Sequence, residues 1–200
     1  MAKVSNKKHG KQSKILGATG EWLFSVAALY AAIPLIATPD SVLDAPGVDF
    51  WAGHLWRDAG YDTLVPVEVK TSVRNSNGRR FDLRHMTRRQ REVMLGLGGV
   101  AAFVLLETQP KRGYPLEASI WVQRFTKLRN REGKIIASLP HRLLQDMTYP
   151  LASIYLEKTP EFHELHKAFS MLEVQIFDEG LDFFDRIITT RYNVVQVMQV

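Results

Sequence analysis

Cysteine is absent from all 200 residues of the chain. This absence excludes disulfide-stapled scaffolds, thiolate metal sites and cysteine nucleophiles. The sequence also has no internal repeat and no low-complexity tract, and no serine stands in the context of a nucleophile elbow. A reducing cytoplasm fits a chain without cysteine, and we expect a cytoplasmic protein that has no membrane partner.

Long apolar runs are also scarce, and the longest one raises the question of export. The lysine-rich start followed by WLFSVAALYAAIPLIA, residues 22–37, has the outline of a signal peptide. Pro34 interrupts this run, no clear cleavage site follows it, and it is shorter than the roughly 20 residues of a membrane span. We therefore predict a buried helix from Gly17 to about Ile33, ending near Pro34 because proline cannot continue the helical hydrogen bonds. A secreted or membrane-anchored protein stays open as the alternative.

Apolar residues make up 46% of the chain and charged residues 24%, which suits one globular domain with a sizeable core. The net charge of +5 is uneven: residues 161–200 carry seven acidic and three basic side chains, a net −4, so the first 160 residues carry +9. Lysines cluster near the N-terminus, and arginines cluster between Arg74 and Arg91. A polyanion such as nucleic acid is the natural partner of this surface, although a solvated basic face is the commoner explanation of any one cluster.

The apolar periodicity predicts a mixed β-sheet flanked by helices, an α/β or α+β fold. Strands are expected at residues 35–38, 47–53, 63–71, 100–107 and 118–125. A basic loop is expected over 73–86, a helix over 87–98, and helices beyond Pro140, most clearly over 159–180. The expected organisation is a basic N-terminal arm (1–16), a core (17–139) and a mostly helical C-terminal extension packed on that core (140–200).

The stretch GVDFWAGHLWRDAGYDTLVPVEVKTS, residues 47–72, is typical of two strands that place charged side chains on one face. Successive side chains of a strand point to opposite faces, so paired strands would group Asp49 with Glu68 and Lys70. Two carboxylates this close raise each other's pKa unless a cation lies between them, and Mg²⁺ is the hard cation that carboxylates, a carbonyl and waters bind. A surface ion-pair ladder of small energetic value is the alternative.

Asp49, followed after eighteen residues by Glu68-Val69-Lys70, resembles the PD-(D/E)xK nuclease superfamily. The preceding helix, GATGEWLFSVAALYAA, is similar to the first helix of Holliday-junction resolvases, where a glutamate near the helix start, here Glu21, completes the metal site. The segment DLRHMTRRQREVMLGLGGVAAFVLLE resembles the helix-strand unit of RecU-type resolvases, with a glutamine, here Gln90, at the helix start. The resemblance covers roughly residues 17–107.

The match departs from the family name at one position. The proline-aspartate pair Pro39-Asp40 lies nine residues before the corresponding place, and Asp49 follows Gly47-Val48 instead. We prefer Asp49, because Asp40 lies in turn-rich sequence, where an aspartate more often caps or starts a turn.

The resemblance implies a restriction-endonuclease-like core and a Mg²⁺-dependent endonuclease of DNA recombination or repair, with Mn²⁺ able to substitute. It implies a homodimer that cleaves branched DNA such as a Holliday junction. A restriction-type or repair nuclease, or a non-catalytic nucleic-acid-binding module, stays open. The implied catalytic residues are Lys70, Glu68, Asp49, Glu21 and Gln90, and the implied metal ligands are Asp49, Glu68, Val69 and Glu21.

Two of these residues have an equally good structural explanation. An acid such as Glu21 near a helix start is favoured by the helix dipole. Thr87 and Gln90 fit a capping box, with Thr87 as N-cap and Gln90 at the third helical position, so a cap role and a site role carry equal weight for Gln90.

Arginines crowd the predicted helix start around Arg88 and Arg89, where the helix dipole disfavours cations. A phosphate bound by the free N–H groups of the first turn would remove this conflict. We therefore predict that the segment from Arg74 to Arg91 contacts the DNA backbone beside the metal site. The DNA-binding candidates are Arg74, Arg79, Arg80, Arg84, Arg88, Arg89, Arg91, Lys7, Lys8 and Lys11.

Overall fold

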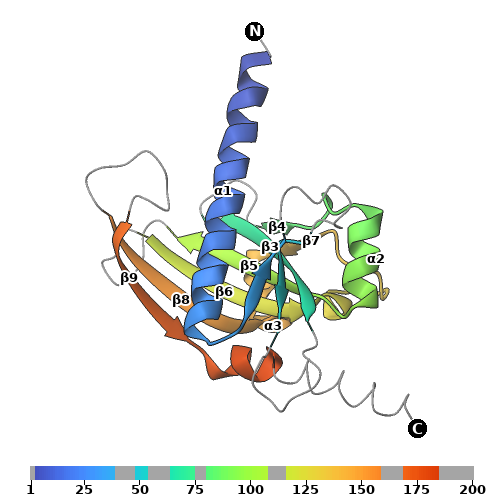
Figure 1. The fold of residues 1–200 in the computed structure, drawn as a ribbon. Helices are drawn as coiled ribbons and strands as arrows, with labels where there is room; N and C mark the ends of the chain where they lie inside the picture. The colour runs from blue at the N-terminus through green and yellow to red at the C-terminus, as the bar shows by residue number, and fades with distance from the viewer. Residues whose placement is uncertain are drawn as a thin grey trace.

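A seven-stranded mixed β-sheet forms the centre of the molecule (Figure 1). The computed structural model describes residues 3–38, 48–53, 64–74, 80–107, 116–158 and 169–184, with the backbone alone at 3–12, 158 and 169–171. In spatial order the strands are β1 (Leu35–Ala37), β2 (Phe50–Ala52), β3 (Val65–Val73), β5 (Val100–Glu107), β6 (Leu116–Arg124), β8 (Tyr149–Lys158) and β9 (Phe169–Ile176). Strands β3 and β5 are parallel, and the other neighbouring pairs are antiparallel. The prediction of a mixed sheet flanked by helices is confirmed.

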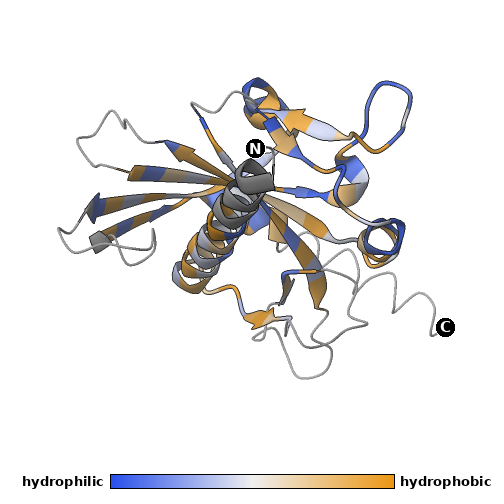
Figure 2. Ribbon diagram, turned by 90° about the horizontal axis from the view of Figure 1, so that it is seen from above, coloured by the Kyte–Doolittle hydropathy of each residue, from blue (hydrophilic) through white to orange (hydrophobic). Residues whose placement is uncertain are grey.

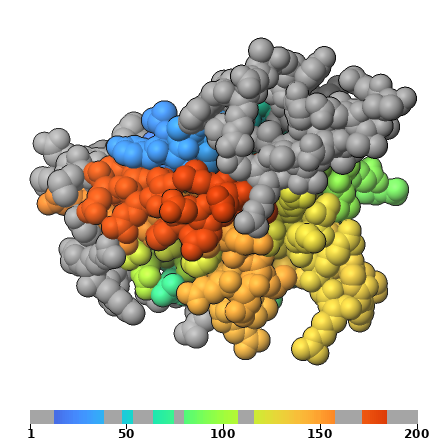
Figure 3. All heavy atoms as spheres, turned by 90° about the horizontal axis from the view of Figure 1, so that it is seen from below, coloured from blue at the N-terminus to red at the C-terminus, as the bar shows by residue number. Residues whose placement is uncertain are grey.

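Helices cover both faces of this sheet. Helix α1 (Lys3–Tyr30) crosses one face, and Figure 2, which looks along this helix, shows the strands curling around it. Helix α2 (Arg88–Gly96) lies on the other face, together with a two-stranded sheet of β4 (Arg80–Asp82) and β7 (Ser138–Pro140). Figure 3 shows β9 and the helical segment that follows it beside α1. The remaining short elements are η1 (Phe125–Lys127), η2 (His141–Leu143), α3 (Leu144–Met147) and a helical segment at 178–184.

Two buried clusters, one on each face of the sheet, make up the core. Along β5 the side chains alternate between them: Val100 and Val104 belong to the cluster under α1, whereas Ala101 and Phe103 belong to the cluster under α2. All four side chains are fully buried. The predicted strand that is buried on both faces is confirmed, because the continuous apolar run of β5 fills both cores.

Glycine allows α1 to approach β3 closely. A Cβ atom at Gly20 would lie 1.7 Å from Thr71 Oγ1 and 2.8 Å from Thr71 Cβ, which are distances that real side chains do not show. Glu21 is the next residue of the helix, so this contact brings Glu21 to the side of β3. The apolar residues of the same stretch, such as Leu23 and Phe24, are buried in the core. None of the helices that the structure describes is both long and apolar enough to cross a membrane.

The two ends of α1 compare differently with the prediction. The helix begins at Lys3 rather than at Gly17, because no proline interrupts the segment before Gly17, whose lysines and Gln12 favour a helix although Gly10 does not. It ends at Tyr30, before Pro34 as expected but three residues short of the predicted end at Ile33. The end is a Schellman motif, in which the Ile33 amide donates to the Ala28 carbonyl at 2.8 Å. Ala32, which directly precedes Ile33, has a φ of 54°.

Among the described residues the predicted mostly helical C-terminal extension (140–200) is helical only at 141–147 and 178–184, and residues 159–168 of its clearest predicted helix lie outside them. Residues 149–158 and 169–176 are strands β8 and β9, which continue the main sheet beyond β6. In β9 Leu172, Val174 and Ile176 pack on the core cluster under α1 and alternate with polar residues, which is the period of a strand. The acidic residues of this region favoured a helix in the sequence, but the alternation of LEVQI and the buried, continuous run LASIYL of β8 decided the structure.

Two smaller predictions need correction. The expected basic loop over 73–86 contains strand β4, which pairs with β7 because Phe81 and Leu139 face each other in the core. The predicted helix over 159–180 would end in the sequence FDEG, residues 177–180, yet the helical segment 178–184 begins there, with Asp178 and Glu179 in its first turn, where acids are favoured.

Candidate functional site

The pairing of β2 with β3 brings Asp49 next to Glu68. Phe50 of β2 lies opposite Val67 of β3, and the Asp49 amide donates to the Val67 carbonyl at 3.0 Å. Asp49 therefore stands at the start of β2, one residue before the first position of the ladder. The two strands predicted in this stretch are confirmed, and they pair with each other.

The Asp49 carboxylate binds a backbone amide of β3 beyond the described pairing of β2 with β3. Its Oδ2 atom accepts a hydrogen bond from the Val69 amide at 2.6 Å. The N–H and C=O groups of one strand residue point to the same side, so Val69, like Val67, presents both groups toward β2. Because β2 does not extend that far, the side chain of Asp49 satisfies the amide. The Val69 carbonyl is directed toward the same edge.

Glu68 is a buried acid whose carboxylate is only half satisfied. The residue is 4% exposed, its Oε1 atom forms an ion pair with the Lys70 ammonium, and its Oε2 atom has no hydrogen-bond partner among the described residues. Burial, followed by the charge of Asp49, raises the pKa of Glu68 to about 7, against the lowering effect of Lys70. A further cation beside Oε2 would stabilise the charged form of this acid.

The pKa of Asp49 is also subject to opposing effects. Burial raises the pKa of its carboxyl above the ordinary value, while the Val69 hydrogen bond and the charge of Lys70 lower it. Two adjacent acids that both resist ionisation are typical of functional sites, although structural ion-pair networks produce the same pattern.

Glu21 approaches this pair from the helix. Its charge raises the pKa of Glu68, as the smallest of the contributions to that shift. The pKa of Glu68 on β3 therefore responds to the charges of both other acids expected at the site, Asp49 at the start of β2 and Glu21 on α1. Glu21 is half-buried.

The donor types at this edge suit a hard cation. Two carboxylates and a main-chain carbonyl are oxygen ligands of the kind that Mg²⁺ binds, and Glu68 Oε2 is a buried oxygen without a partner among the described residues. Within those residues, however, no three acidic or histidine side chains converge closely enough to form a metal cluster. In this arrangement the Lys70 ammonium provides the positive charge beside Glu68. The residues fit the ion by chemistry, with Lys70 as its competitor.

Gln90 has a clear structural role. Its side-chain Oε1 atom accepts a hydrogen bond from the Thr87 main-chain N–H at 2.5 Å. The main-chain N–H of Gln90 donates to Thr87 Oγ1 at 3.2 Å. This reciprocal pair is the capping box expected from the sequence, and it begins α2. The Gln90 amide oxygen is engaged in the cap, and a further role at the site stays a prediction.

The arginines at the start of α2 have partners within the protein. Arg88 pairs with Glu92 at 2.7 Å, one turn further along the helix. Arg91 Nη2 donates to the carbonyl of Leu83 at 3.2 Å and to that of Arg84 at 3.4 Å. The expected conflict with the helix dipole is relieved inside the chain, so the argument for a bound anion at this helix start loses its premise.

The other DNA-binding candidates divide into three groups. Arg74 pairs with Glu107 at 3.1 Å and Arg84 pairs with Asp82 at 2.5 Å, both near the surface. Arg80 and Arg89 are exposed. Arg79 lies outside the described residues, and so do the side chains of Lys7, Lys8 and Lys11. The segment from β4 to α2 that carries these arginines covers the face of the sheet to which Glu68 and Lys70 point.

A polar contact on that same face was not predicted from the sequence. The Ser72 hydroxyl, two residues after Lys70, lies 2.9 Å from His141 Nε2 and donates to the Arg80 carbonyl at 3.2 Å. The only sequence signal was that Ser72 continues the polar face of β3, since His141 comes from a distant part of the chain. This contact ties the arginine-bearing strand β4 to β3 beside the candidate site.

Comparison of the chain with models of protein families, with curated proteins and with solved structures finds no match.

Proposed function

We propose that the protein is a Mg²⁺-dependent DNA endonuclease that hydrolyses phosphodiester bonds. Asp49, Glu68 and the Val69 carbonyl hold the ion, Glu21 completes its surroundings, and Lys70 assists the nucleophile. Mn²⁺ substitutes for Mg²⁺, because the ligands are oxygen atoms that bind either ion.

The observation that carries this proposal is the buried, half-satisfied carboxylate of Glu68. A glutamate with a raised pKa and a buried oxygen that has no partner among the described residues is costly to keep in a fold. It stands here beside Asp49, a second acid whose pKa is raised by burial. A surface ion-pair ladder would be solvated and would not bury the acid to this degree.

The surroundings support the same function. The order around the site is α1, the main-sheet strands β1, β2 and β3, the short strand β4, then α2 and β5, and this order supports the restriction-endonuclease-like core that the sequence resemblance implies. The arginine-bearing segment from β4 to α2 lies on the face to which Lys70 points, where a DNA backbone would pass.

Asp49, Glu68 and Lys70 would have different roles in the reaction. A bound Mg²⁺ supplies Lewis acidity and charge neutralisation. Asp49 is held by the Val69 amide and Glu68 by the rigid β3, so both carboxylates are positioned before the substrate arrives. Lys70 shares the face of Glu68, where its ammonium orients a water molecule and stabilises the charge that develops on the phosphate.

Branched DNA is the favoured substrate within this class. Symmetric cleavage of a four-way junction requires two centres, so we infer a homodimer. A restriction-type or repair nuclease would use the same residues, and the substrate comparison below separates these possibilities.

The test is a cleavage assay with a synthetic four-way junction and a linear duplex of matched sequence, each in Mg²⁺ and in EDTA. Cleavage in Mg²⁺ should fall by about a hundredfold or more in Asp49→Asn, Glu68→Gln and Lys70→Met. Glu117→Gln, which changes a half-buried glutamate of β6, is the matched control and should cleave normally. Preference for the junction supports a resolvase, equal cleavage supports a general nuclease, and full activity of Glu68→Gln would disprove the site.

A non-catalytic nucleic-acid-binding module is the second candidate. It is favoured by two contacts that the site residues make with each other: Lys70 pairs with Glu68 Oε1, and the Val69 amide donates to Asp49 Oδ2. Such a module would bind both DNA substrates and cleave neither in Mg²⁺ or Mn²⁺. It would also bind equally well after Glu68→Gln.

A further inference from the structure

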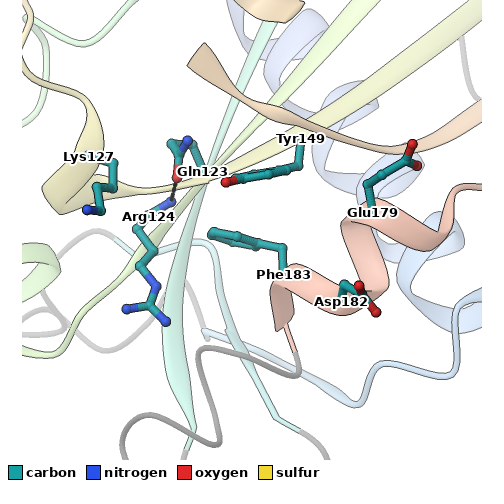
Figure 4. Close-up of a pocket in the computed structure, with 7 residues that line it drawn as sticks. All are labelled: Gln123, Arg124, Lys127, Tyr149, Glu179, Asp182 and Phe183. Atoms are coloured by element: carbon teal, nitrogen blue, oxygen red, sulfur yellow. Dashed lines mark hydrogen bonds between the residues drawn. The ribbon is translucent and has the colours of Figure 1, made fainter. Parts of the chain in front are cut away.

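A pocket of about 460 Å³ lies at one end of the main sheet, away from the acidic site (Figure 4). Its walls come from the end of β6, the turn η1, the start of β8 and the helical segment 178–184. The volume lies within the roughly 300–1,000 Å³ of ordinary small-molecule sites. The lining residues used below are Arg124, Lys127, Tyr149, Glu179, Asp182 and Phe183.

The strand register shows that this pocket is separate from the candidate nuclease site. Arg124 pairs with Val100, and Val100 pairs with Val67. Residues aligned across a sheet point to the same face, and Val67 and Val100 both belong to the cluster under α1. Glu68, the next residue of β3, points to the opposite face. The pocket therefore opens on the α1 face, and a ligand there would not occupy the Glu68 site.

Two aromatic rings give the pocket a flat apolar surface. Tyr149 and Phe183 stack with their centroids 5.2 Å apart and an angle of 26° between the rings. Phe183 is 7% exposed and anchors the pair in the core, whereas Tyr149 is 40% exposed. The free side of the Tyr149 ring can stack against a planar ligand.

The charges in the pocket are segregated. Figure 4 shows Arg124 and Lys127 on one side of the aromatic pair and Glu179 and Asp182 on the other. Neither Arg124 nor Lys127 forms an ion pair with another residue in the described part of the chain. The Arg124 backbone is held by its amide, which donates to Gln123 Oε1 at 2.8 Å. The basic side therefore has two positively charged groups available to a ligand, and the acidic side would repel an anion.

We propose that this pocket binds a nucleoside monophosphate, with the phosphate at Arg124 and Lys127 and the base against Tyr149. Two cations match the double charge of a phosphomonoester better than the single charge of a carboxylate, and the guanidinium of arginine binds two phosphate oxygens at once. The acids at the other end set the orientation, because they repel the phosphate and accept hydrogen bonds from the amino and hydroxyl groups of the nucleoside.

Two kinds of ligand carry this combination of terminal phosphate, sugar and base. One is a free mononucleotide, and the other is the phosphorylated end of a DNA strand. Both present a terminal phosphate followed by a sugar and a base, whereas an internal phosphodiester has a single charge and does not match this pocket as well.

Isothermal titration calorimetry in EDTA tests the proposal, because this measurement needs neither a metal ion nor DNA cleavage. The probes are 2′-deoxyadenosine 5′-monophosphate, 2′-deoxyadenosine and inorganic phosphate, each added to the full chain. The monophosphate should bind at least about tenfold more tightly than either fragment, because only it uses both the cations and the aromatic surface. Absence of monophosphate binding at millimolar concentration, or equal binding of the nucleoside, would overturn the proposal.

Variants locate the binding. Arg124→Gln and Tyr149→Leu should each weaken monophosphate binding by about tenfold or more, whereas Arg142→Gln, at an exposed arginine outside the pocket, should bind as the parent does. Lys127→Gln, at an exposed residue, provides a second variant if Arg124→Gln does not fold. Unchanged binding in both Arg124→Gln and Lys127→Gln would contradict the proposal.

Two oligonucleotides distinguish the sources. Tighter binding of a 5′-phosphorylated strand than of the 5′-hydroxyl strand, abolished in Arg124→Gln, assigns the pocket to a strand end. Equal binding of both strands, with the mononucleotide bound as expected, assigns it to a free nucleotide. Glu68→Gln should bind the mononucleotide normally, so failure of the nuclease proposal would leave this result unaffected.

Discussion

Asp49 and Val69 are joined by a hydrogen bond of 2.6 Å from the Val69 amide to the Asp49 Oδ2 atom. This bond gives the Val69 amide a partner beyond the described pairing of β2 with β3, and it holds the carboxylate of Asp49 beside Glu68. Asp49 therefore has a structural role whether or not a metal ion binds, and its variants must be designed to separate the two roles.

Two substitutions of Asp49 distinguish its structural role from its role in metal binding. Asp49→Asn keeps an oxygen that accepts from the Val69 amide, whereas Asp49→Ala leaves the amide without this partner at a cost of about 1–3 kcal/mol. Chemical denaturation should therefore find Asp49→Ala less stable than Asp49→Asn, while the nuclease proposal requires both to lose cleavage. Equal stability of the two variants would show that the hydrogen bond contributes little.

The raised pKa of Glu68 predicts a pH dependence of stability. With a pKa of about 7 in the folded protein and 4.5 as the reference, the folded state retains a proton that the unfolded state has lost. Stability from this group is present below about pH 4.5, is lost as the pH rises through 7, and is constant beyond. The lost part is at most about 3 kcal/mol.

Glu68→Gln removes this titration, and the comparison is made in EDTA. The free energy of unfolding of the variant, minus that of the parent, should increase between pH 4.5 and pH 7.5. Glu117→Gln is the control and should show no such trend. A flat difference for Glu68→Gln would mean that the acid is better solvated than its burial indicates.

The close approach of α1 to β3 predicts opposite effects at two glycines. Gly20→Ala would place its Cβ atom 1.7 Å from Thr71 Oγ1, so the helix must move from the sheet, and we expect a loss of about 2 kcal/mol or more. Gly17→Ala meets no atom within 4 Å and should stabilise the helix by about 0.5–1 kcal/mol. Thermal denaturation of both variants measures the difference, and a stable Gly20→Ala would rule out this packing.

Ala32 ends α1 in a left-handed conformation that favours glycine, with a φ of 54°. Ala32→Gly should therefore increase the stability by about 0.5–1 kcal/mol, which is the usual cost of this conformation for a residue with a Cβ atom. Ala28→Gly, inside the same helix, should instead destabilise the protein. Chemical denaturation of the two variants checks the sign of each change.

The exposed arginines predict the salt dependence of DNA binding. Arg80→Gln combined with Arg89→Gln should weaken binding to all DNA sequences. The slope of log K against log salt should become shallower by about 1 for each phosphate that the variant no longer neutralises. Arg142→Gln is the matched control. Fluorescence anisotropy at several salt concentrations measures the slope, and an unchanged slope would exclude these two arginines from the DNA interface.

The N-terminal half of the fold was predictable because its signals are local. The capping box of Thr87 and Gln90, the left-handed Gly98 after α2 and the alternation around Val67 and Glu68 depend on residues that are neighbours in the chain. The grouping of Asp49 with Glu68 required one further assumption, that two strands pair, and it was correct. Strands β8 and β9 were not predicted, because a strand in a sheet owes its stability to partners distant in sequence.

The sequence by itself determined the polar face of β3, the buried strand β5, the end of α1 and the start of α2, since periodicity, capping and proline act within a few residues. Only the tertiary structure decided how deeply Glu68 is buried, which of its oxygens lacks a partner among the described residues, that His141 meets Ser72, and that Arg124 and Tyr149 border one pocket. These features arise where segments far apart in the chain pack together, and burial and charge interactions depend on that packing rather than on the local sequence.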